Sequence, residues 1–473
     1  MERQTKLIRN LDWFTIILYI VMVFLGWLNI YAAVYDENHN SIFDISQRYG
    51  KQMIWILFAF ILGIVIILTD SKFFTTFSFV IYGIVMASLI AVIYAGLEVN
   101  GSRSWIRIAG FQIQPTEFSK FATALAVANL MSRHNFRIMR FKSVLQLGLI
   151  VGIPILLILL QNDTGSALVF CSFLLVFYRE GMHGSILLLF FCTVLLFIFT
   201  LLYSPMTVLL MIILGTLGSF LYYRHSRQEL FTVILALSAT FLFGIFLNWL
   251  FDLKKEYSNI LLYSYAVICV VSIYFIYKNK MKHIIMLLLA SWLCICSTIT
   301  VDYVFDRLQP HQQKRINNLL GIDSDITGAG YNVHQSKIAI GSGGFSGKGF
   351  LEGTQTKFNF VPEQSTDFIY CTIGEEWGFL GSTTVILLFV ILMIRIIKLA
   401  ERQRSAFSRI YGYCVAAIFF FHVAVNIGMT IGMAPVIGIP LPFFSYGGSS
   451  LWAFTILLFI FLRLDANRLQ VFR

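Results

Sequence analysis

"WFTIILYIVMVFLGWLNIYAAV", residues 13–34, decides the fold class, because it carries no charged side chain over a length that can cross a bilayer. Across the 473 residues, 58% belong to the AVILMFWYC set, 12% are charged, and the mean hydropathy is +0.79. Soluble domains hold about 45–50% apolar and about 25% charged residues. The chain is therefore predicted to be an integral membrane protein. Apolar runs of about 20 residues, with no alternation over about 10, indicate helices and exclude a transmembrane β-barrel.

Fourteen apolar runs predict an all-α polytopic membrane protein with about 14 transmembrane helices. We divide the chain into an N-terminal bundle of about six spans (1–180), an expanded membrane region (181–304), a long loop (305–369) and a C-terminal bundle of about three spans (370–473). The runs fall at residues 13–34, 53–69, 75–96, 116–131, 144–160, 164–178, 184–203, 205–223, 230–251, 259–277, 283–304, 370–394, 410–433 and 449–465.

The charge distribution predicts that both termini are cytoplasmic. The N-terminal "MERQTKLIRN" is basic, and the long run after it lacks a small-residue cleavage site, so we expect a retained first span. With the N-terminus inside, most of the 35 Lys and Arg residues fall in cytoplasmic segments, as the positive-inside rule requires. The 305–369 loop then lies outside.

Four polar or glycine- and proline-rich stretches share the outer side in this topology. They are "NGSRSWIRIAGFQIQPTEFSK" (100–120), "QNDTGSA" (161–167), the 305–369 loop and "MAPVIGIPLPFFSYGGSS" (433–450). Their common side predicts one site assembled from distant segments.

Ionisable residues inside a membrane segment are costly and are usually paired or functional. Pro115 suits a first helical turn, and Glu117 and Lys120 are three residues apart, on one helix face. One interpretation is a mutually satisfied ion pair that holds the span in place. The other is that Lys120 meets an anionic substrate while Glu117 orients it.

Several carboxylate side chains lie where the long loop ends and the next apolar run begins. Asp367 follows Ser365 and Thr366, either of which could cap a helix entering the membrane. On a continuous helix, Glu375 would lie about 12 Å deeper than Asp367 and Glu376 would point to the opposite side. Only Asp367 would then sit at the mouth, where partial desolvation favours a general base. The alternative is a helix cap or a solvated loop charge.

The glycine-rich "IAIGSGGFSGKGF" (338–350) departs twice from the phosphate-loop pattern G-x-x-x-x-G-K-[ST]. Tight turns explain its glycines, and a run of backbone N–H groups around an anion is the alternative. Arg315, Lys337 and Lys348 in the same long loop are candidate phosphate ligands.

Four motifs resemble the SEDS (shape, elongation, division and sporulation) family, nearer to its rod-shape branch, RodA, than to its division branch, FtsW. The resemblance covers roughly residues 10–180 and 305–465. The motifs are "QPTEFSK" (114–120), "GAGYNVHQSKIAIGSGGFSGKGFLEGTQ" (328–355), "FVPEQSTDFIYCTIGEEWGFLG" (360–381) and "PVIGIPLPFFSYGGSS" (435–450).

This resemblance implies a peptidoglycan glycosyltransferase that polymerises lipid II at the outer face of the bacterial cytoplasmic membrane during cell elongation. Asp367 is implied as the essential acid or base. Glu117, Lys120 and Trp105 are the best matched of the other substrate-binding residues, and Asp163 is retained. Lys120, Arg315, Lys337 and Lys348 are the candidates to neutralise the diphosphate of the leaving undecaprenyl pyrophosphate.

The resemblance also implies partners: lipid II and the nascent glycan strand, a class B penicillin-binding protein transpeptidase, the elongation machinery and membrane lipid, with no nucleic acid. A divalent cation, Mg²⁺ or Mn²⁺, would suit a diphosphate, but no ligand cluster in the sequence specifies one. No organic cofactor is implied.

Two features depart from the family pattern. The family has about ten spans, so about four extra spans are expected within 184–304. In "QNDTGSA" (161–167), Asn162 and Thr164 replace the usual Pro and Leu.

Two other function classes are compatible with the sequence. A lipid II flippase could use Glu117, Lys120 and Asp163 along a headgroup route, although we find no repeated halves of the kind common in transporters. A noncatalytic scaffold would leave the ionisable residues at the outer face unexplained.

Overall fold

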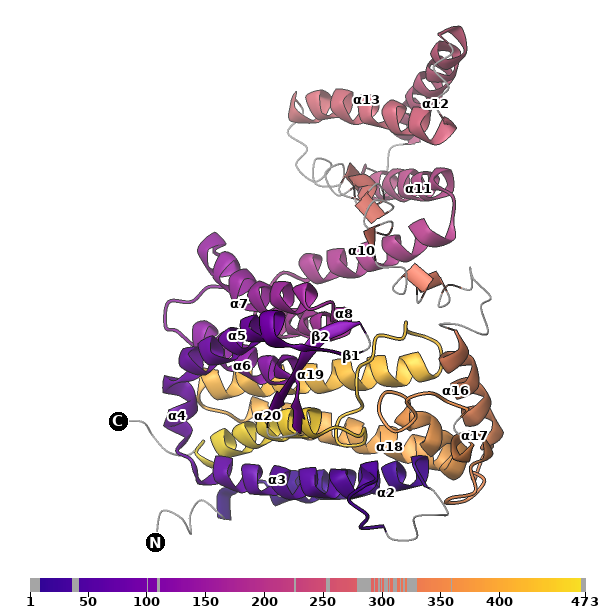
Figure 1. Ribbon diagram of the computed structural model, residues 1–473. Helices are drawn as coiled ribbons and strands as arrows, with labels where there is room; N and C mark the ends of the chain where they lie inside the picture. The colour runs from indigo at the N-terminus through magenta and orange to yellow at the C-terminus, as the bar shows by residue number, and fades with distance from the viewer. Residues whose placement is uncertain are drawn as a thin grey trace. The chain divides into compact units, whose positions relative to one another are not determined.

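A computed structural model provides the structure of the chain. It describes residues 9–35, 42–99, 101–108, 111–224, 227–251, 256–278, 291–292, 294–296, 298, 300–301, 305, 307–308, 313–314, 316–317, 320, 330–358 and 360–468. The chain forms two compact units, one from Met1–His183 with Asp325–Arg473 and the other from Gly184–Ser324 (Figure 1).

The predicted all-α polytopic class is confirmed. Among the described residues, nine helices are long and apolar enough to cross a membrane, and three shorter apolar helices accompany them. The predicted run at 283–304 lies largely outside the described residues. Helix α6 (Pro115–Met131), which carries Glu117 and Lys120, covers the predicted run at 116–131.

The first unit contains long membrane helices, short connecting helices and the later part of the long loop, with α16 and α17. Besides α6, its helices are α2 (Trp13–Ala33), α3 (Arg48–Leu68), α4 (Ser71–Thr76), α5 (Ser78–Ala95), α7 (Phe141–Leu160), α8 (Thr164–Leu168), η1 (Val169–Ser172), α9 (Phe173–Arg179), α16 (Tyr331–Ser342), α17 (Thr354–Lys357), α18 (Ile369–Glu401), α19 (Ala406–Thr430) and α20 (Gly448–Ala466).

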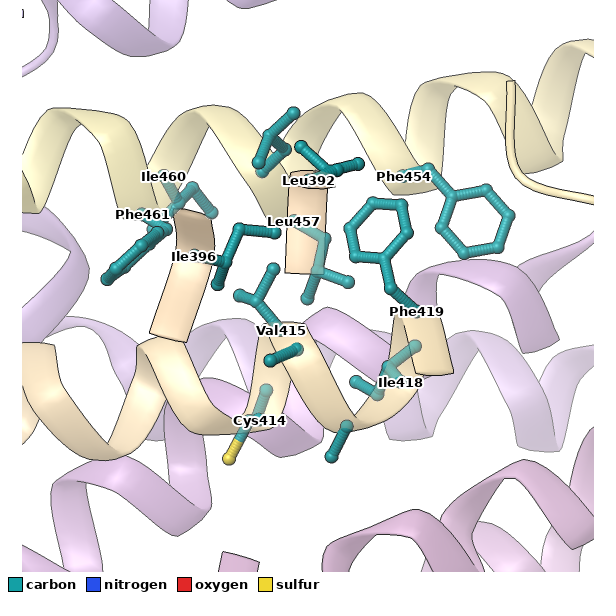
Figure 2. Close-up of a cluster of buried hydrophobic side chains, with 14 of the residues drawn as sticks. Leu392, Ile396, Cys414, Val415, Ile418, Phe419, Phe454, Leu457, Ile460 and Phe461 are labelled. Carbon is teal, nitrogen blue, oxygen red and sulfur yellow. The ribbon is translucent and has the colours of Figure 1, made fainter. Parts of the chain in front are cut away.

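The core of this unit lies where α18, α19 and α20 meet. Figure 2 shows Leu392 and Ile396 of α18, Val415 of α19 and Leu457 of α20 among the side chains that fill this space. A Cβ on Gly412 of α19 would lie 2.5 Å from the Phe461 ring, so a small residue is required for this close approach. The core helices also pack on their neighbours: α20 on α3, α19 on α6 and α18 on α2 (Figure 1).

The second unit contains α10 (Gly184–Leu202), α11 (Pro205–Arg224), α12 (Arg227–Leu250) and α13 (Tyr257–Lys278). Val208 and Ile212 of α11 and Tyr265 and Cys269 of α13 belong to its own apolar core. The sequence of this region suggests no catalytic or binding residues, and the described core consists of packed apolar side chains.

A small antiparallel sheet is present that the sequence analysis did not predict. Strands β1 (Leu97–Val99), β2 (Ser102–Ile108) and β3 (Phe111–Ile113) pair in the order β1-β2-β3. The backbone of Trp105 lies opposite that of Leu97. The sheet leads directly into α6, so it positions the start of that helix.

Helix α18 is broken at Gly378, whose φ of 62° and ψ of −155° are not helical. Four backbone hydrogen bonds of 2.9–3.2 Å join residues 344–349 to residues 375–380. These bonds satisfy groups that the break leaves without helical partners. The glycine-rich stretch 338–350 is therefore docked on the broken helix, with left-handed φ angles at Gly344, Gly347 and Gly349.

The continuous helix assumed around Asp367 is a wrong prediction. Asp367 lies in a turn at residues 362–368, and α18 begins only at Ile369. Neither Ser365 nor Thr366 caps the helix, because its N-cap is Phe368, which makes no side-chain cap hydrogen bond. The turn instead bonds to other segments. Glu375 and Glu376 are both buried.

Gly378→Ala tests the break. A Cβ there would lie 2.3 Å from the Gly347 backbone N, and the left-handed φ strains any L-residue, so we expect a loss of about 1–3 kcal/mol. Gly83→Ala in α5 is the control, because its Cβ would meet no atom within 4 Å. Thermal unfolding in one detergent compares them; a Gly378→Ala midpoint equal to that of wild type would contradict the account.

Candidate functional site

Asp367 lies at the meeting of two segments far apart in sequence. Its half-buried side chain belongs to the 362–368 turn, and its Oδ2 lies 3.4 Å from where a Cβ on Gly438 would stand. Gly438 has a φ of +69° and belongs to the 431–447 loop between α19 and α20. The left-handed φ would strain a side chain at this position, and its Cβ would contact the carboxylate. The glycine therefore leaves space beside Asp367.

The fully buried side chain of Asn426 on α19 connects these two segments. Its amide nitrogen donates hydrogen bonds to the Asp367 carbonyl at 2.9 Å and to the Ile439 carbonyl at 2.7 Å. One side chain thus uses both amide hydrogens to fix the turn and the loop against the same helix. The sequence analysis missed Asn426, because a single polar residue in an apolar run carries no pattern.

Two further bonds hold the 431–447 loop to the turn. The Tyr446 backbone N–H donates to the Ser365 carbonyl at 2.8 Å, and the Ser445 hydroxyl donates to the Thr366 carbonyl at 2.6 Å. We call Asn426, Ser445 and Tyr446 together the clamp. Because it bonds the carbonyls of three successive turn residues, the clamp restricts the direction of the Asp367 side chain.

Arg48, at the start of α3, is a cation beside the same turn. Its guanidinium donates to the Ser365 hydroxyl at 2.7 Å, lies 3.8 Å from Glu363, and stands 5.8 Å from the centre of the Tyr446 ring. Its side chain is about half exposed, so it can also meet an anion. The sequence analysis did not single out Arg48.

Lys337 lies close to the same loop. It is an exposed residue of α16, and its Nζ would be 2.4 Å from a Cβ on Gly432. The neighbouring Ser336 donates a 2.9 Å hydrogen bond to the Thr430 carbonyl, which fixes α16 to the end of α19. Arg315, the second loop cation predicted, lies outside the described residues.

Glu117 and Lys120 form the ion pair that one of the two interpretations predicted. The Lys120 ammonium lies 2.8 Å from Glu117 Oε2 and 3.0 Å from Nε2 of His422 on α19. These three residues are only 3%, 2% and 1% exposed. The pair therefore holds α6 against α19. Direct contact of Glu117 or Lys120 with a substrate stays a prediction.

His422 extends this buried cluster to the loop beside Asp367. Its Nδ1 lies 3.2 Å from the Pro440 carbonyl, which can only accept, so Nδ1 carries the hydrogen. Nε2 is then free to accept from the Lys120 ammonium. The sequence analysis missed His422, which lies one helical turn before Asn426.

Lys348 of the long loop pairs with Glu375 of α18, with 2.6 Å between Nζ and Oε1. The same carboxylate accepts from the backbone N–H groups of Gln355 at 2.8 Å and Thr356 at 2.9 Å. Lys348 therefore has its charge compensated within the protein. Its predicted role as a phosphate ligand would require this pair to open.

The Glu375 carboxylate is connected to the turn of Asp367 through one more residue. Gln364, three positions before Asp367, donates to the Thr356 carbonyl at 2.8 Å and to the Ala33 carbonyl at 2.7 Å. Glu375 thus orders the start of α17, and α17 supports the turn that carries Asp367.

Asp163 and Trp105 lie in elements that flank this region. Asp163 is the N-cap of α8 and accepts from the Ser166 backbone N–H at 3.0 Å, the Ser166 hydroxyl at 2.8 Å and Gln114 Nε2 at 3.1 Å. These bonds give its carboxylate a structural task. Trp105 lies half-buried in β2. Substrate binding by either residue stays a prediction.

The predicted assembly of distant polar stretches is confirmed for the described residues. The Gln114 backbone N–H donates to the Ser449 hydroxyl at 3.1 Å, which joins the 100–120 stretch to the start of α20. A Cβ on Gly165 would lie 2.0 Å from the Ile437 carbonyl oxygen, which shows how closely the 161–167 stretch approaches the loop. The site is thus built from the 362–368 turn and the 431–447 loop, which α3, α16 and α19 hold, with the two other stretches beside them.

Comparison with known proteins gives a family match along nearly the whole chain. The family model of the FtsW/RodA/SpoVE cell cycle proteins matches residues 12–214 and 206–470. The peptidoglycan glycosyltransferase RodA of Treponema pallidum (strain Nichols) is 31% identical over 471 residues, which cover 98% of this chain and 99% of that protein. The peptidoglycan glycosyltransferase MrdB of Escherichia coli (strain K12) is 46% identical over 147 residues, 31% of this chain and 40% of that protein.

Two solved structures share the fold. One, described as "Structural coordination of polymerization and crosslinking by a peptidoglycan synthase complex", aligns with a TM-score of 0.61 at 22% identity over 98% of this chain and 99% of that chain. The other is the rod shape determining protein RodA of Thermus thermophilus, with a TM-score of 0.56 at 20% identity over 98% of both chains.

Asn426→Ala tests the clamp through stability. It removes both amide donors and leaves two carbonyl acceptors without that partner, so we expect a loss of about 1–3 kcal/mol. Asn29→Ala is the matched control, because the Asn29 amide donates only to the Leu25 carbonyl of its own helix. Thermal unfolding of both variants should show the larger loss for Asn426→Ala, and equal losses would rule out a special role for its bonds.

Glu117→Gln, Lys120→Met and the double variant test the buried ion pair. Each single change strands a buried partner and should cost about 3–5 kcal/mol, whereas the double change should cost clearly less than the sum. Unfolding midpoints of the four proteins in the same detergent measure this. Additive losses would show that the pair is not coupled.

Proposed function

Because the chain belongs to the FtsW/RodA/SpoVE family of cell cycle proteins, we propose that it is a peptidoglycan glycosyltransferase. It polymerises lipid II into glycan strands during cell elongation. The full-length similarity to a RodA named for this activity supports the proposal, since the match covers 98% of this chain. The chain is a multi-pass membrane protein, and the proposed reaction takes place at the outer face of the cytoplasmic membrane.

The observation that carries the proposal is the setting of Asp367. A half-buried carboxylate lies beside the space left by Gly438, and the clamp fixes its backbone through Asn426. A general base needs a fixed position and partial shielding from water; the clamp fixes the backbone that carries this carboxylate, and half-burial shields it.

Asp367 takes the proton from the 4-hydroxyl of the glucosamine of an incoming lipid II. The hydroxyl oxygen forms a bond to the anomeric carbon of the lipid-linked growing chain. The bond from that carbon to the diphosphate oxygen breaks, and undecaprenyl pyrophosphate leaves with the electron pair. The proton on Asp367 then returns to solvent. Because the diphosphate is an activated leaving group, one base is sufficient.

The leaving diphosphate requires positive charge. Lys337 and Arg48 are the described cations with exposed side chains beside the 431–447 loop or the 362–368 turn, so we assign them this task. Both can approach a lipid-linked anion without breaking a buried ion pair. Lys120 and Lys348 would first have to leave Glu117 and Glu375.

A divalent cation, Mg²⁺ or Mn²⁺, stays a prediction. Among the described residues, no three His, Cys, Asp or Glu side chains gather as ligands. Asp367 and Glu363 are the carboxylates of the 362–368 turn, and Glu363 is already close to Arg48.

We place both termini in the cytoplasm, which puts Asp367 and the clamp outside. The partner we propose is a class B penicillin-binding protein transpeptidase of the elongation machinery, which would crosslink the glycan strands. The fold shared with a chain from a peptidoglycan synthase complex supports this partner, although that likeness concerns the fold alone.

Asp367→Asn tests the proposed base. The change keeps the side-chain volume and removes the proton acceptor, so lipid II polymerisation should fall by about 10²-fold or more. Glu352→Gln, an equivalent change at an exposed carboxylate of the same loop, should polymerise at the wild-type rate.

Glycan products are resolved on gels, with and without the cognate transpeptidase blocked by a β-lactam, from proteins that remain monodisperse. Equal polymer from wild type and Asp367→Asn would reject Asp367 as the base. No polymer from wild type, together with transport of lipid II across vesicle membranes, would reject the glycosyltransferase and favour a flippase.

A further inference from the structure

Four exposed aromatic side chains gather where the glycine-rich stretch docks on the broken helix. Phe345, Phe350, Trp377 and Phe379, here called the aromatic patch, are 68%, 39%, 43% and 60% exposed. The Phe345 and Phe379 rings stack with centres 5.9 Å apart, and the Phe350 and Trp377 centres lie 6.0 Å apart. Two loop residues are thus fixed against two residues that flank Gly378.

The second half of α18 gives the depth of this patch in the membrane. Arg395 bonds to Asp12, the N-cap of α2, so this ion pair places the start of α2 level with a point on α18 six residues before that helix ends at Glu401. From Arg395 to Phe379 the helix rises about 24 Å, at about 1.5 Å per residue. The hydrocarbon core of a bilayer is about 30 Å thick. Phe379 therefore lies near the membrane boundary opposite the ion pair.

Helix α2 gives a second, independent measure from the same ion pair. Tyr31 lies about 28 Å along the helix from Asp12, at about 1.5 Å per residue. Its ring centre is 6.4 Å from that of Phe350, which in turn contacts Trp377. Measured from one ion pair, α2 and α18 therefore bring the patch to the same depth. This depth is where Trp and Tyr side chains concentrate in membrane proteins.

The exposed face of α18 continues the patch toward the other side of the membrane. Leu380, Leu387, Ile391 and Ile394 follow helical spacing on one face and are all exposed in the chain. A span has to present such a face to lipid. The non-helical backbone of 344–349 can lie at the boundary because its bonds to residues 375–380 satisfy its polar groups.

We propose that the aromatic patch binds the phospholipid surface of the bilayer and holds the 344–350 segment at headgroup depth. The segment assigned by sequence to a loop outside the membrane is thus partly a membrane-contact element. Through Lys348 and Glu375 it is joined to α17 and so to the turn with Asp367. The inference depends on helix lengths and ring contacts, not on the proposed reaction, so either can fail alone.

Depth-dependent quenching of tryptophan fluorescence tests the proposal. Phe345→Trp, Phe379→Trp and Ile391→Trp are each reconstituted in phosphatidylcholine vesicles that contain lipids brominated at shallow or deep acyl positions. The wild-type signal is subtracted to isolate the added tryptophan. Phe379→Trp reports the boundary, and Ile391→Trp, about 18 Å further along the helix, reports the interior.

The expected result is that Phe345→Trp is quenched by the shallow bromines, with the same profile as Phe379→Trp, while Ile391→Trp is quenched by the deep ones. If no brominated lipid quenches Phe345→Trp while Phe379→Trp responds, the segment lies in water or against protein and the proposal is wrong. Phe345 is exposed, so its replacement should leave the fold intact, and size-exclusion chromatography checks this.

Discussion

Two hydrogen bonds from the Asn426 amide are the constraint on which the site depends. They join the carbonyls of Asp367 and Ile439 to one face of α19, and His422, one turn earlier, binds the Pro440 carbonyl from the same face. Inside a membrane protein, backbone carbonyls outside helices need such partners, because lipid offers none. The helix therefore fixes two irregular segments and the carboxylate that lies between them.

Buried charge extends this order away from the carboxylate. The Glu117–Lys120 pair holds α6 to α19 through His422, and Glu375 organises the long loop from the broken part of α18. Each charge is compensated within the protein, which such burial requires. Cations with exposed side chains beside the site, Lys337 and Arg48, can then respond to a diphosphate. Structural and chemical tasks are divided between the buried and the exposed charges.

The sequence was sufficient to predict the helical membrane class and the approach of several polar stretches, because long apolar runs and the polar stretches between them can be read directly from the order of residues. It could not identify His422 and Asn426, whose partners are backbone carbonyls in a loop and a turn and whose own surroundings are apolar. The break at Gly378 was missed for a similar reason. Its compensation comes from residues 344–349, about thirty positions earlier. The resemblance supplied Asp367's role, and the structure supplied its surroundings.

The most direct test of this account is the steady-state rate of lipid II polymerisation by Asn426→Ala and Asn29→Ala at a temperature where both are folded. If the clamp positions Asp367, Asn426→Ala lowers kcat by about tenfold or more with KM nearly unchanged, because small displacements of a catalytic group have large effects. Asn29→Ala should retain the wild-type kcat. A wild-type kcat for folded Asn426→Ala would contradict the claim that the clamp positions the base.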